Sequence, residues 1–171
     1  MEQQQFNCRK ATAQDVGRIW EILQQAIERR RLEGSQQWQD GYPNPNTLAA
    51  DLDQGVGFVA EAQGVILAYF AVIENHEPAY DAIDGNWLTD GTFIVLHRVA
   101  VAEEYLGKGY AEKILNHVEV LAQQRGIASI RADTNFDNPA MLHLFEKLGY
   151  TYCGEVYFRG APRMAYEKPV V

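Results

Sequence analysis

Cysteine and histidine are scarce in this sequence. Its 171 residues include two cysteines, Cys8 and Cys153, and four scattered histidines. The two cysteines could pair in principle, but a single pair in a chain without an export signal is expected to stay reduced. With so few ligands and no cluster among them, the sequence predicts no metal site.

Long hydrophobic runs and an excess of basic residues are also lacking. The longest apolar run, Val65–Ile73, is far too short to span a bilayer, and the N-terminal segment MEQQQFNCRK lacks the apolar core of a signal peptide. The 15 Lys and Arg residues against 23 Asp and Glu residues leave a net charge of −8. Nucleic acids and anionic membranes bind clustered Lys and Arg, so neither partner is expected. The sequence predicts a cytoplasmic protein whose partners are small molecules or other proteins.

The periodicity of apolar residues predicts an α/β fold in one domain. The length is close to that of a single domain, and no repeat, low-complexity tract or linker is evident, so one domain over residues 1–171 is expected. The elements follow in the order βααβββαβαββ, which describes a mixed sheet flanked by about four helices. The predicted strands are 6–9, 57–62, 65–73, 92–101, 129–133, 150–158 and 163–168, and the predicted helices begin near 12–15, 47, 110 and 138. A polar loop is expected over 74–91.

Two glycines stand where the strand 92–101 hands over to a helix. In the segment LGKGYA, residues 106–111, Gly107 and Gly109 come just before apolar residues at helical spacing. A helix N-terminus attracts phosphate through its unpaired N–H groups and dipole, and glycine lets a bulky anion approach the backbone. The alternative is a strand-to-helix turn that needs glycine only for its backbone angles. The two glycines alone leave these alternatives even.

This junction resembles a signature of the GCN5-related N-acetyltransferases, the GNAT family, and the resemblance spans nearly the whole chain in element order. The signature is Gln or Arg, two residues, Gly, one residue, then Gly or Ala, after a strand that ends like VAV here. Gly109 and Ala111 match it, whereas Leu106 stands where the family has Gln or Arg. That position acts partly through its backbone N–H group, so the phosphate site is retained.

A second segment, about thirty residues on, carries the same resemblance. The family has Asn, seven residues later Tyr, and then Gly and an aromatic residue. Asn138, Gly149 and Tyr150 match, and Phe145 replaces the tyrosine. The order and spacing of the two segments make the signal moderately specific.

The resemblance implies a GNAT-like fold that binds acetyl-CoA and transfers its acetyl group to an amine. The pyrophosphate would contact N–H groups from Gly107 to Ala111, and the backbone of Val99 and Val101 would pair with the pantetheine arm like an added strand. Asn138 would reach the same arm, and it is also suited to be a helix N-cap before Pro139. The implied cofactor-binding residues are Val99, Val101, Gly107, Lys108, Gly109, Tyr110, Ala111 and Asn138.

His97 is the candidate catalytic base. An attacking amine must be neutral, yet a free alkylamine has a pKa of about 10, and an imidazole is suited to accept its proton near neutrality. The segment LHRVAV is similar to the LHALAV-type segment of arylalkylamine N-acetyltransferases, where histidine occupies this place. Regular alternation would put His97 on the face of Val99 and Val101, although a bulge would change this. The alternative is a hydrogen-bonded core histidine.

The general acid is left open. With Phe145 in place of tyrosine, departure of the thiolate should be slower but not blocked, because a thiol has a pKa of about 8.5. The tyrosines that would substitute are Tyr110, Tyr150, Tyr152 and Tyr157, and the sequence does not choose among them.

The acceptor site of such enzymes is built from the first two helices, their connecting loop and the closing strands. Here these segments hold Trp38, Tyr42, Tyr157 and Arg159, with Arg163 nearby. The aromatic residues would wall a pocket, and the arginines would bind a carboxylate. The alternatives are that Trp38 and Tyr42 anchor a long loop and that the arginines are exposed and solvated.

Three functions follow as alternatives. The first is acetylation of a small amine or amino-acid-like metabolite, the second is acetylation of a protein N-terminus or lysine, and the third is binding of acetyl-CoA without turnover. No metal is expected, and whether the chain forms a homodimer is left open.

Overall fold

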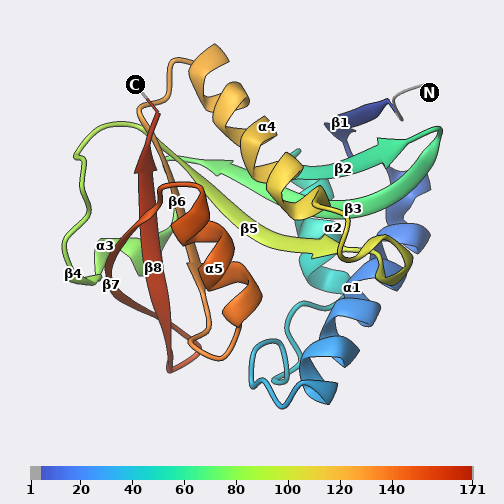
Figure 1. The fold of residues 1–171 in the computed structure, drawn as a ribbon, viewed down its shortest axis with the longest axis horizontal. Helices are drawn as coiled ribbons and strands as arrows, with labels where there is room; N and C mark the ends of the chain where they lie inside the picture. Colours follow the sequence, from blue (N-terminus) through green and yellow to red (C-terminus); the bar gives the residue numbers. More distant parts are fainter. Residues whose placement is uncertain (1–4, 171) are drawn as a thin grey trace. The chain divides into compact units, whose positions relative to one another are not determined.

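The computed structural model describes residues 5–170 and contains a mixed sheet of eight strands in the order β1-β2-β3-β5-β6-β8-β7-β4 (Figure 1). The contacts divide the chain into two compact units. One, here called the N-terminal unit, comprises the chain up to Val72 together with Arg98–His117. The other, the C-terminal unit, comprises Ile73–His97 and the chain from Val118 onward.

The first three strands of the chain pair antiparallel with one another. Strand β1 (Phe6–Lys10) pairs with β2 (Gly57–Ala62), and β2 pairs with β3 (Val65–Glu74), which enters the C-terminal unit at Ile73. The hairpin turn between β2 and β3 has φ of 52° at Gln63 and 75° at Gly64. These left-handed angles are those of a two-residue hairpin turn, which fits the two-residue gap between the predicted strands 57–62 and 65–73.

Two helices of this unit supply its core. After the short 3₁₀ turn η1 (Ala13–Asp15), helix α1 (Val16–Leu32) buries residues at spacings of three and four, and α2 (Pro45–Asp53) buries Leu48. A capping box lies where the sequence predicted that the first helix begins, and in it the Thr12 N–H group donates to Asp15 at 2.7 Å. The hydrophobic core cluster of this unit, here called the core cluster, consists of Ile19, Ile22, Leu23, Ala26, Trp38, Leu48, Val59, Tyr69, Ala100 and Ala102.

The C-terminal unit holds the other part of the sheet. The first residues of β5 (Phe93–Val101) pair in parallel with β6 (Ser129–Thr134), from Phe93 with Ser129 to Leu96 with Ala132. Strand β6 pairs antiparallel with β8 (Ala161–Pro169), and β8 with β7 (Thr151–Phe158). Helix α5 (Pro139–Lys147) follows β6. Helix α4 (Tyr110–Gln124) enters this unit at Val118.

Two short elements lie where the sequence predicted only a polar loop. Helix α3 (Pro78–Asp81) has four residues and strand β4 (Asp84–Gly85) has two, so neither is long enough to show a periodic pattern. Strand β4 exists because it pairs with β7, where Gly85 lies opposite Gly154. Their backbones approach so closely that a side chain on Gly85 would meet the carbonyl oxygen of Cys153.

Both cysteines are free thiols. Burial raises the pKa of Cys8 to about 12 and, as the largest contribution, also raises the pKa of Cys153. Both groups therefore stay protonated near neutral pH, which makes them poor nucleophiles.

Candidate active site

The segment between β5 and α4 forms a glycine-rich turn. The short 3₁₀ turn η2 (Glu103–Tyr105) precedes it, and Gly107 and Gly109 adopt φ of 73° and 80°. Among residues 5–170, and apart from the glycine and its two chain neighbours, no heavy atom lies within 4 Å of the position that a Cβ would take on either glycine. The backbone angles therefore require glycine, and the turn also leaves open space beside the start of α4, as a bulky anion would need.

One lysine lies within this turn and a second lies just after it. The ammonium of Lys108 lies 5.5 Å from the centre of the Tyr105 ring, and that of Lys113 lies 5.5 Å from the ring of Tyr110. Lys113 was not among the residues predicted from the sequence, because it lies outside the signature. Helical periodicity could have found it, since it lies four residues after Gly109 in the first turn of α4 and its N–H group donates to the Gly109 carbonyl at 3.1 Å. One acid, Glu112, also lies in that turn.

Arg98 interrupts the regular geometry of β5. Its φ is 55°, in the left-handed region that a residue other than glycine occupies at a cost of about 1 to 3 kcal/mol. The side chains of β5 therefore do not keep their regular alternation of faces at residue 98. Counting residues along the strand no longer places His97 on the same face as Val99 and Val101. Val99 is half-buried and Val101 is buried.

A buried polar network surrounds Arg98. Its guanidinium donates two hydrogen bonds to the Asp51 carboxylate, at 2.8 and 2.6 Å, and one to the Tyr42 hydroxyl at 2.6 Å. Burial acts to lower the pKa of Arg98, but Tyr42 and Asp51 outweigh it and raise the pKa above the usual value. The arginine is therefore permanently charged.

His97 lies in a cluster of ionisable side chains within the C-terminal unit. Its Nε2 atom lies 2.8 Å from a carboxylate oxygen of Glu77, and its Nδ1 atom lies 3.7 Å from Asp133. The hydroxyl of Tyr80 donates to the same Asp133 oxygen at 2.5 Å. Asp133 also lies 3.9 Å from Arg163. The His97 side chain is 11% exposed.

The contact with Glu77 assigns the proton on the imidazole. Burial raises the pKa of Glu77, but the hydrogen bond with His97 and its charge lower it more, so the carboxylate is ionised. An ionised carboxylate only accepts, so Nε2 carries a hydrogen, and when the ring is neutral Nδ1 is the nitrogen that can accept a proton. A structural histidine in the core and a catalytic base held in position by a carboxylate would both show this hydrogen bond, so the geometry agrees with either role of His97. The sequence reasoning missed Glu77, because it lies in the loop before α3 and twenty residues from His97.

Asn138 and Phe145 lie on α5. Asn138 is the N-cap of the helix, and its side-chain oxygen accepts from the Met141 N–H group at 3.3 Å, which confirms the predicted cap. Phe145 is buried, with its ring 5.2 Å from that of Tyr150 and 4.9 Å from that of Tyr166. The Tyr150 hydroxyl is buried without a hydrogen-bond partner among residues 5–170.

The predicted acceptor residues of the N-terminal unit anchor the loop between α1 and α2. Trp38 is 5% exposed, belongs to the core cluster and stacks with Arg30, whose guanidinium lies 4.3 Å from its ring. Tyr42 packs against the same cluster and accepts from Arg98. These contacts agree with the alternative in which Trp38 and Tyr42 anchor a long loop to the core.

The predicted acceptor residues of the C-terminal unit lie at the end of its sheet. Tyr157 is half-exposed and donates to Glu155 at 3.1 Å, and Arg159 is exposed in the two-residue turn between β7 and β8. Arg163, which one alternative described as exposed and solvated, is buried, so that interpretation was wrong. It faces Asp133 because β8 turns this position toward the interior of the unit.

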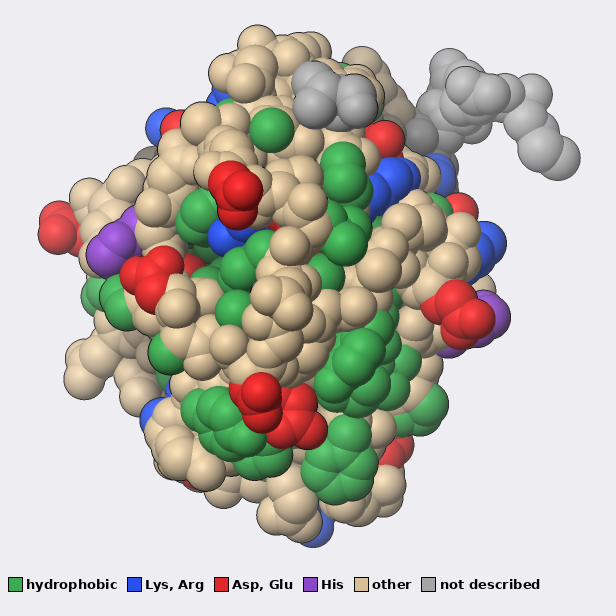
Figure 2. Space-filling model, turned by 90° about the vertical axis from the view of Figure 1, so that its left-hand side faces the viewer, with side chains coloured by type: hydrophobic (Ala, Val, Ile, Leu, Met, Phe, Trp, Pro, Cys, Tyr) green, Lys and Arg blue, Asp and Glu red, His purple; other side chains and the backbone are tan. Residues whose placement is uncertain are grey.

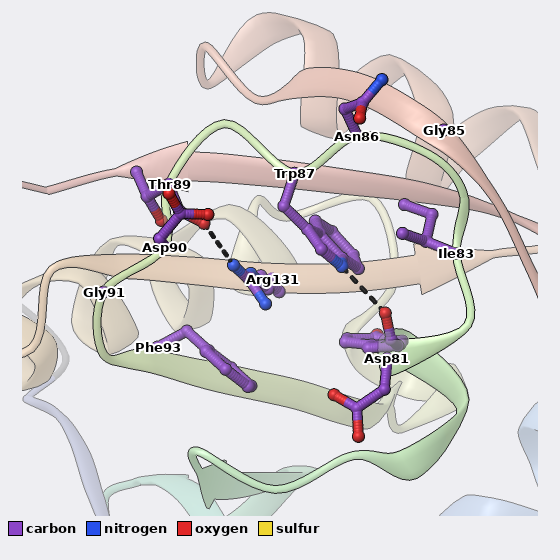
Figure 3. A pocket seen from close by; sticks show the side chains of 11 residues that line it. Asp81, Ile83, Gly85, Asn86, Trp87, Thr89, Asp90, Gly91, Phe93 and Arg131 are labelled. Carbon is purple, nitrogen blue, oxygen red and sulfur yellow. Dashed lines mark hydrogen bonds between the residues drawn. The ribbon is translucent and has the colours of Figure 1, made fainter.

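A cavity of about 410 Å³ in the C-terminal unit contains none of the predicted acceptor residues. Figure 3 shows Arg131 between the rings of Trp87 and Phe93, with its guanidinium carbon 4.5 and 4.1 Å from their centres. Arg131 donates to Glu167 at 2.8 Å, which also accepts from the Leu88 and Thr89 N–H groups. The network therefore holds the 86–91 loop on the sheet.

Figure 2 views the side of β4 and shows hydrophobic side chains gathered among acidic ones.

The described residues offer neither a metal cluster nor a membrane span. Within residues 5–170, three or more His, Cys, Asp or Glu side chains nowhere converge as metal ligands would. In the same range, each helix is too short or too polar to cross a bilayer.

A mixed sheet, a glycine turn before a helix and an asparagine-capped helix after the next strand are the features that the resemblance to the GNAT family implied. In agreement, the sequence model of the acetyltransferase (GNAT) family matches residues 19–150. The chain belongs to the GNAT acetyltransferase family, whose members use acetyl-CoA and act on amine acceptors. No match was found among curated proteins.

Solved structures agree with this assignment. A GNAT-family acetyltransferase from Streptococcus agalactiae is 36% identical, with a TM-score of 0.87 over 96% of this chain and 95% of that one. The acetyltransferase yncA from Salmonella typhimurium, solved with its cofactor acetyl-CoA, is 18% identical, with a TM-score of 0.69 over 98% and 95%. The ribosomal-protein-S18-alanine N-acetyltransferase from Escherichia coli is 16% identical, with a TM-score of 0.68 over 97% and 94%. The last two show likeness of fold alone.

Proposed function

We propose that this protein transfers the acetyl group of acetyl-CoA to the amine of a small metabolite or amino-acid-like acceptor. The observation that carries the proposal is the turn at Gly107 and Gly109, whose left-handed angles leave open space before α4 in a chain of the GNAT family. N–H groups from Gly107 to Ala111 would contact the pyrophosphate, with Lys108 adding positive charge. A phosphate group fits this turn better than a neutral ligand does.

The backbone beyond Arg98 would hold the rest of the cofactor. Val99 and Val101 would pair with the pantetheine arm through backbone groups, which needs no particular side chain. Asn138 would contribute from α5, where it already caps the helix with one of its polar atoms.

The transfer needs a base for the amine. When bound, acetyl-CoA supplies a thioester whose carbonyl carbon accepts the amine nitrogen, while the carbon–sulfur bond breaks. His97 would accept the amine proton at Nδ1, directly or through a water, because Nε2 already donates to Glu77. The charges of Glu77 and Asp133 would favour the imidazolium that forms.

Departure of the thiolate leads to a prediction for Phe145. If that step limits turnover, Phe145→Tyr is expected to raise kcat by up to roughly 10²-fold, the lower end of general acid catalysis, because the family's hydroxyl is restored. Steady-state rates and melting temperature would be measured on the same preparation. A kcat that stays flat in a folded variant would show that thiolate departure is not limiting or that another tyrosine already serves.

Location, domain organisation and assembly remain predictions. The family match over residues 19–150 draws on both units, which supports one acetyltransferase domain over residues 1–171. The net charge of −8 supports a protein that binds neither nucleic acid nor an anionic membrane, and a cytoplasmic location stays a prediction from the sequence. Sedimentation would determine whether it forms a homodimer.

The experiment that tests the function is thiol release from acetyl-CoA over a panel of amines, amino acids, lysine peptides and peptides with free N-termini. Calorimetry with CoA on the same protein would run beside it. Turnover with small amines supports the proposal, and turnover with peptides alone would replace it with protein acetylation. Binding of CoA without turnover would identify a binding protein, which the missing tyrosine at Phe145 makes worth testing.

A further inference from the structure

Arg98 holds a backbone conformation that glycine or asparagine adopts more readily, in the middle of a strand. Its φ is 55°, while β5 continues on both sides of it, from Phe93 to Val101. Such an outlier persists only where surrounding contacts over-determine it. The contacts made by its side chain are therefore the place to look for its role.

These contacts come from a carboxylate and a phenol. The guanidinium binds Asp51 with two parallel hydrogen bonds and donates a third to Tyr42. Tyr69 donates its hydroxyl to Asp51 at 2.6 Å, so the carboxylate is held from a second side. The Arg98 and Asp51 side chains are 9% and 6% exposed. A buried bidentate pair of this kind is directional as well as strong.

The network joins distant segments of the N-terminal unit. Asp51 lies on α2, Tyr69 on β3, and Tyr42 in the loop between α1 and α2 that also carries Trp38. Arg98 is the residue directly before Val99. The side chain thus connects the loop of the predicted acceptor residues to the strand of the predicted cofactor contacts.

We propose that Arg98 is a positioning residue, which through Asp51 and Tyr42 fixes the backbone of Val99–Val101 for acetyl-CoA and ties it to the loop between α1 and α2. The proposal rests on the proposed function. Without the guanidinium, the left-handed angle would lose its contacts with Asp51 and Tyr42, and the strand is expected to relax toward regular geometry. A displacement of about 1 Å at such a place can cost on the order of 10²-fold in rate.

The test uses variants that separate the backbone angle from the side chain. Arg98→Gly tolerates the left-handed angle but loses the guanidinium, and Arg98→Gly with Asp51→Asn also avoids leaving a buried carboxylate unpaired. The control is Gln63→Gly, which changes a residue of similar φ, 52°, in the β2–β3 turn of the same unit. Tyr42→Phe removes only the tie to the loop.

Three measurements decide the outcome. In the ligand-free protein, amide hydrogen exchange should become faster at Val99–Val101 in the double variant and stay unchanged in the control. Calorimetry should show roughly 10-fold or greater loss of acetyl-CoA affinity in both Arg98 variants, and Tyr42→Phe should raise the acceptor KM more than it lowers kcat.

Either of two results would overturn the proposal. One is unchanged exchange at Val99–Val101. The other is wild-type acetyl-CoA affinity in folded Arg98→Gly, which would mean that only the backbone angle matters. If the wild-type protein itself fails to bind acetyl-CoA, the proposed function fails, while the exchange measurement still decides whether Arg98 fixes the strand.

Discussion

Gly109→Val is expected to abolish measurable binding of acetyl-CoA while the protein stays folded. Gly109 adopts φ of 80°, and a β-branched side chain at this angle is strained by about 1 to 2 kcal/mol. The added side chain would also enter the open space beside the turn, where the pyrophosphate is proposed to lie. The strain would displace the N–H groups that the anion needs, and the side chain would occupy the place of the anion. Calorimetry with acetyl-CoA, with circular dichroism as the check of folding, measures the result.

A matched control separates loss of the site from loss of stability. Gly64 in the β2–β3 turn has φ of 75° and, like Gly109, has no heavy atom of the described chain within 4 Å of the place of a Cβ, apart from its chain neighbours. Gly64→Val should therefore lower the melting temperature by a similar amount and leave acetyl-CoA affinity unchanged. Wild-type affinity in a folded Gly109→Val protein would rule out the phosphate site at this turn.

His97→Ala is expected to lower kcat/KM by about 10²- to 10⁴-fold while acetyl-CoA still binds. In the wild-type protein, kcat/KM should rise with pH, because only the neutral ring accepts the proton of the amine. A core histidine gives the opposite result, since its truncation lowers stability but leaves turnover per folded molecule largely intact. Melting temperature and kcat/KM on the same sample distinguish the two.

Glu77→Gln is the companion variant for His97. Glutamine can still accept from Nε2 but carries no charge, so the imidazolium is less favoured and the midpoint of the pH profile should move to lower pH. Asp133, held by Tyr80 and Arg163, faces the ring from another strand and stays in place. A profile that does not move would show that Glu77 has no electrostatic effect on the base.

Local sequence patterns predicted most elements because those elements depend on local interactions. The Thr12–Asp15 capping box, the apolar spacing of α1 and the Gln63–Gly64 turn each involve residues within a few positions of one another. Strand β4 was missed for the converse reason. It consists of two residues that are a strand only because β7 is beside them.

The candidate site was predicted unevenly for the same reason. The turn at Gly107 and Gly109 and the helix cap at Asn138 are local motifs, and the structure contains both conformations. The partners of His97 come from positions 77 and 133, and those of Arg98 from positions 42 and 51. No spacing rule relates such residues, because folding alone brings them together.

The sequence by itself determined the α/β class, the order of the main elements and the family, because these follow from apolar periodicity, capping and two signatures of fixed spacing. Only the tertiary structure decided that Arg98 breaks the regularity of β5, that Glu77 holds His97, and that Arg163 is buried near Asp133. It also placed Trp38 and Tyr42 against the core. The physical reason is that burial and the pairing of charges depend on which distant segments meet, and a one-dimensional pattern records only neighbours along the chain.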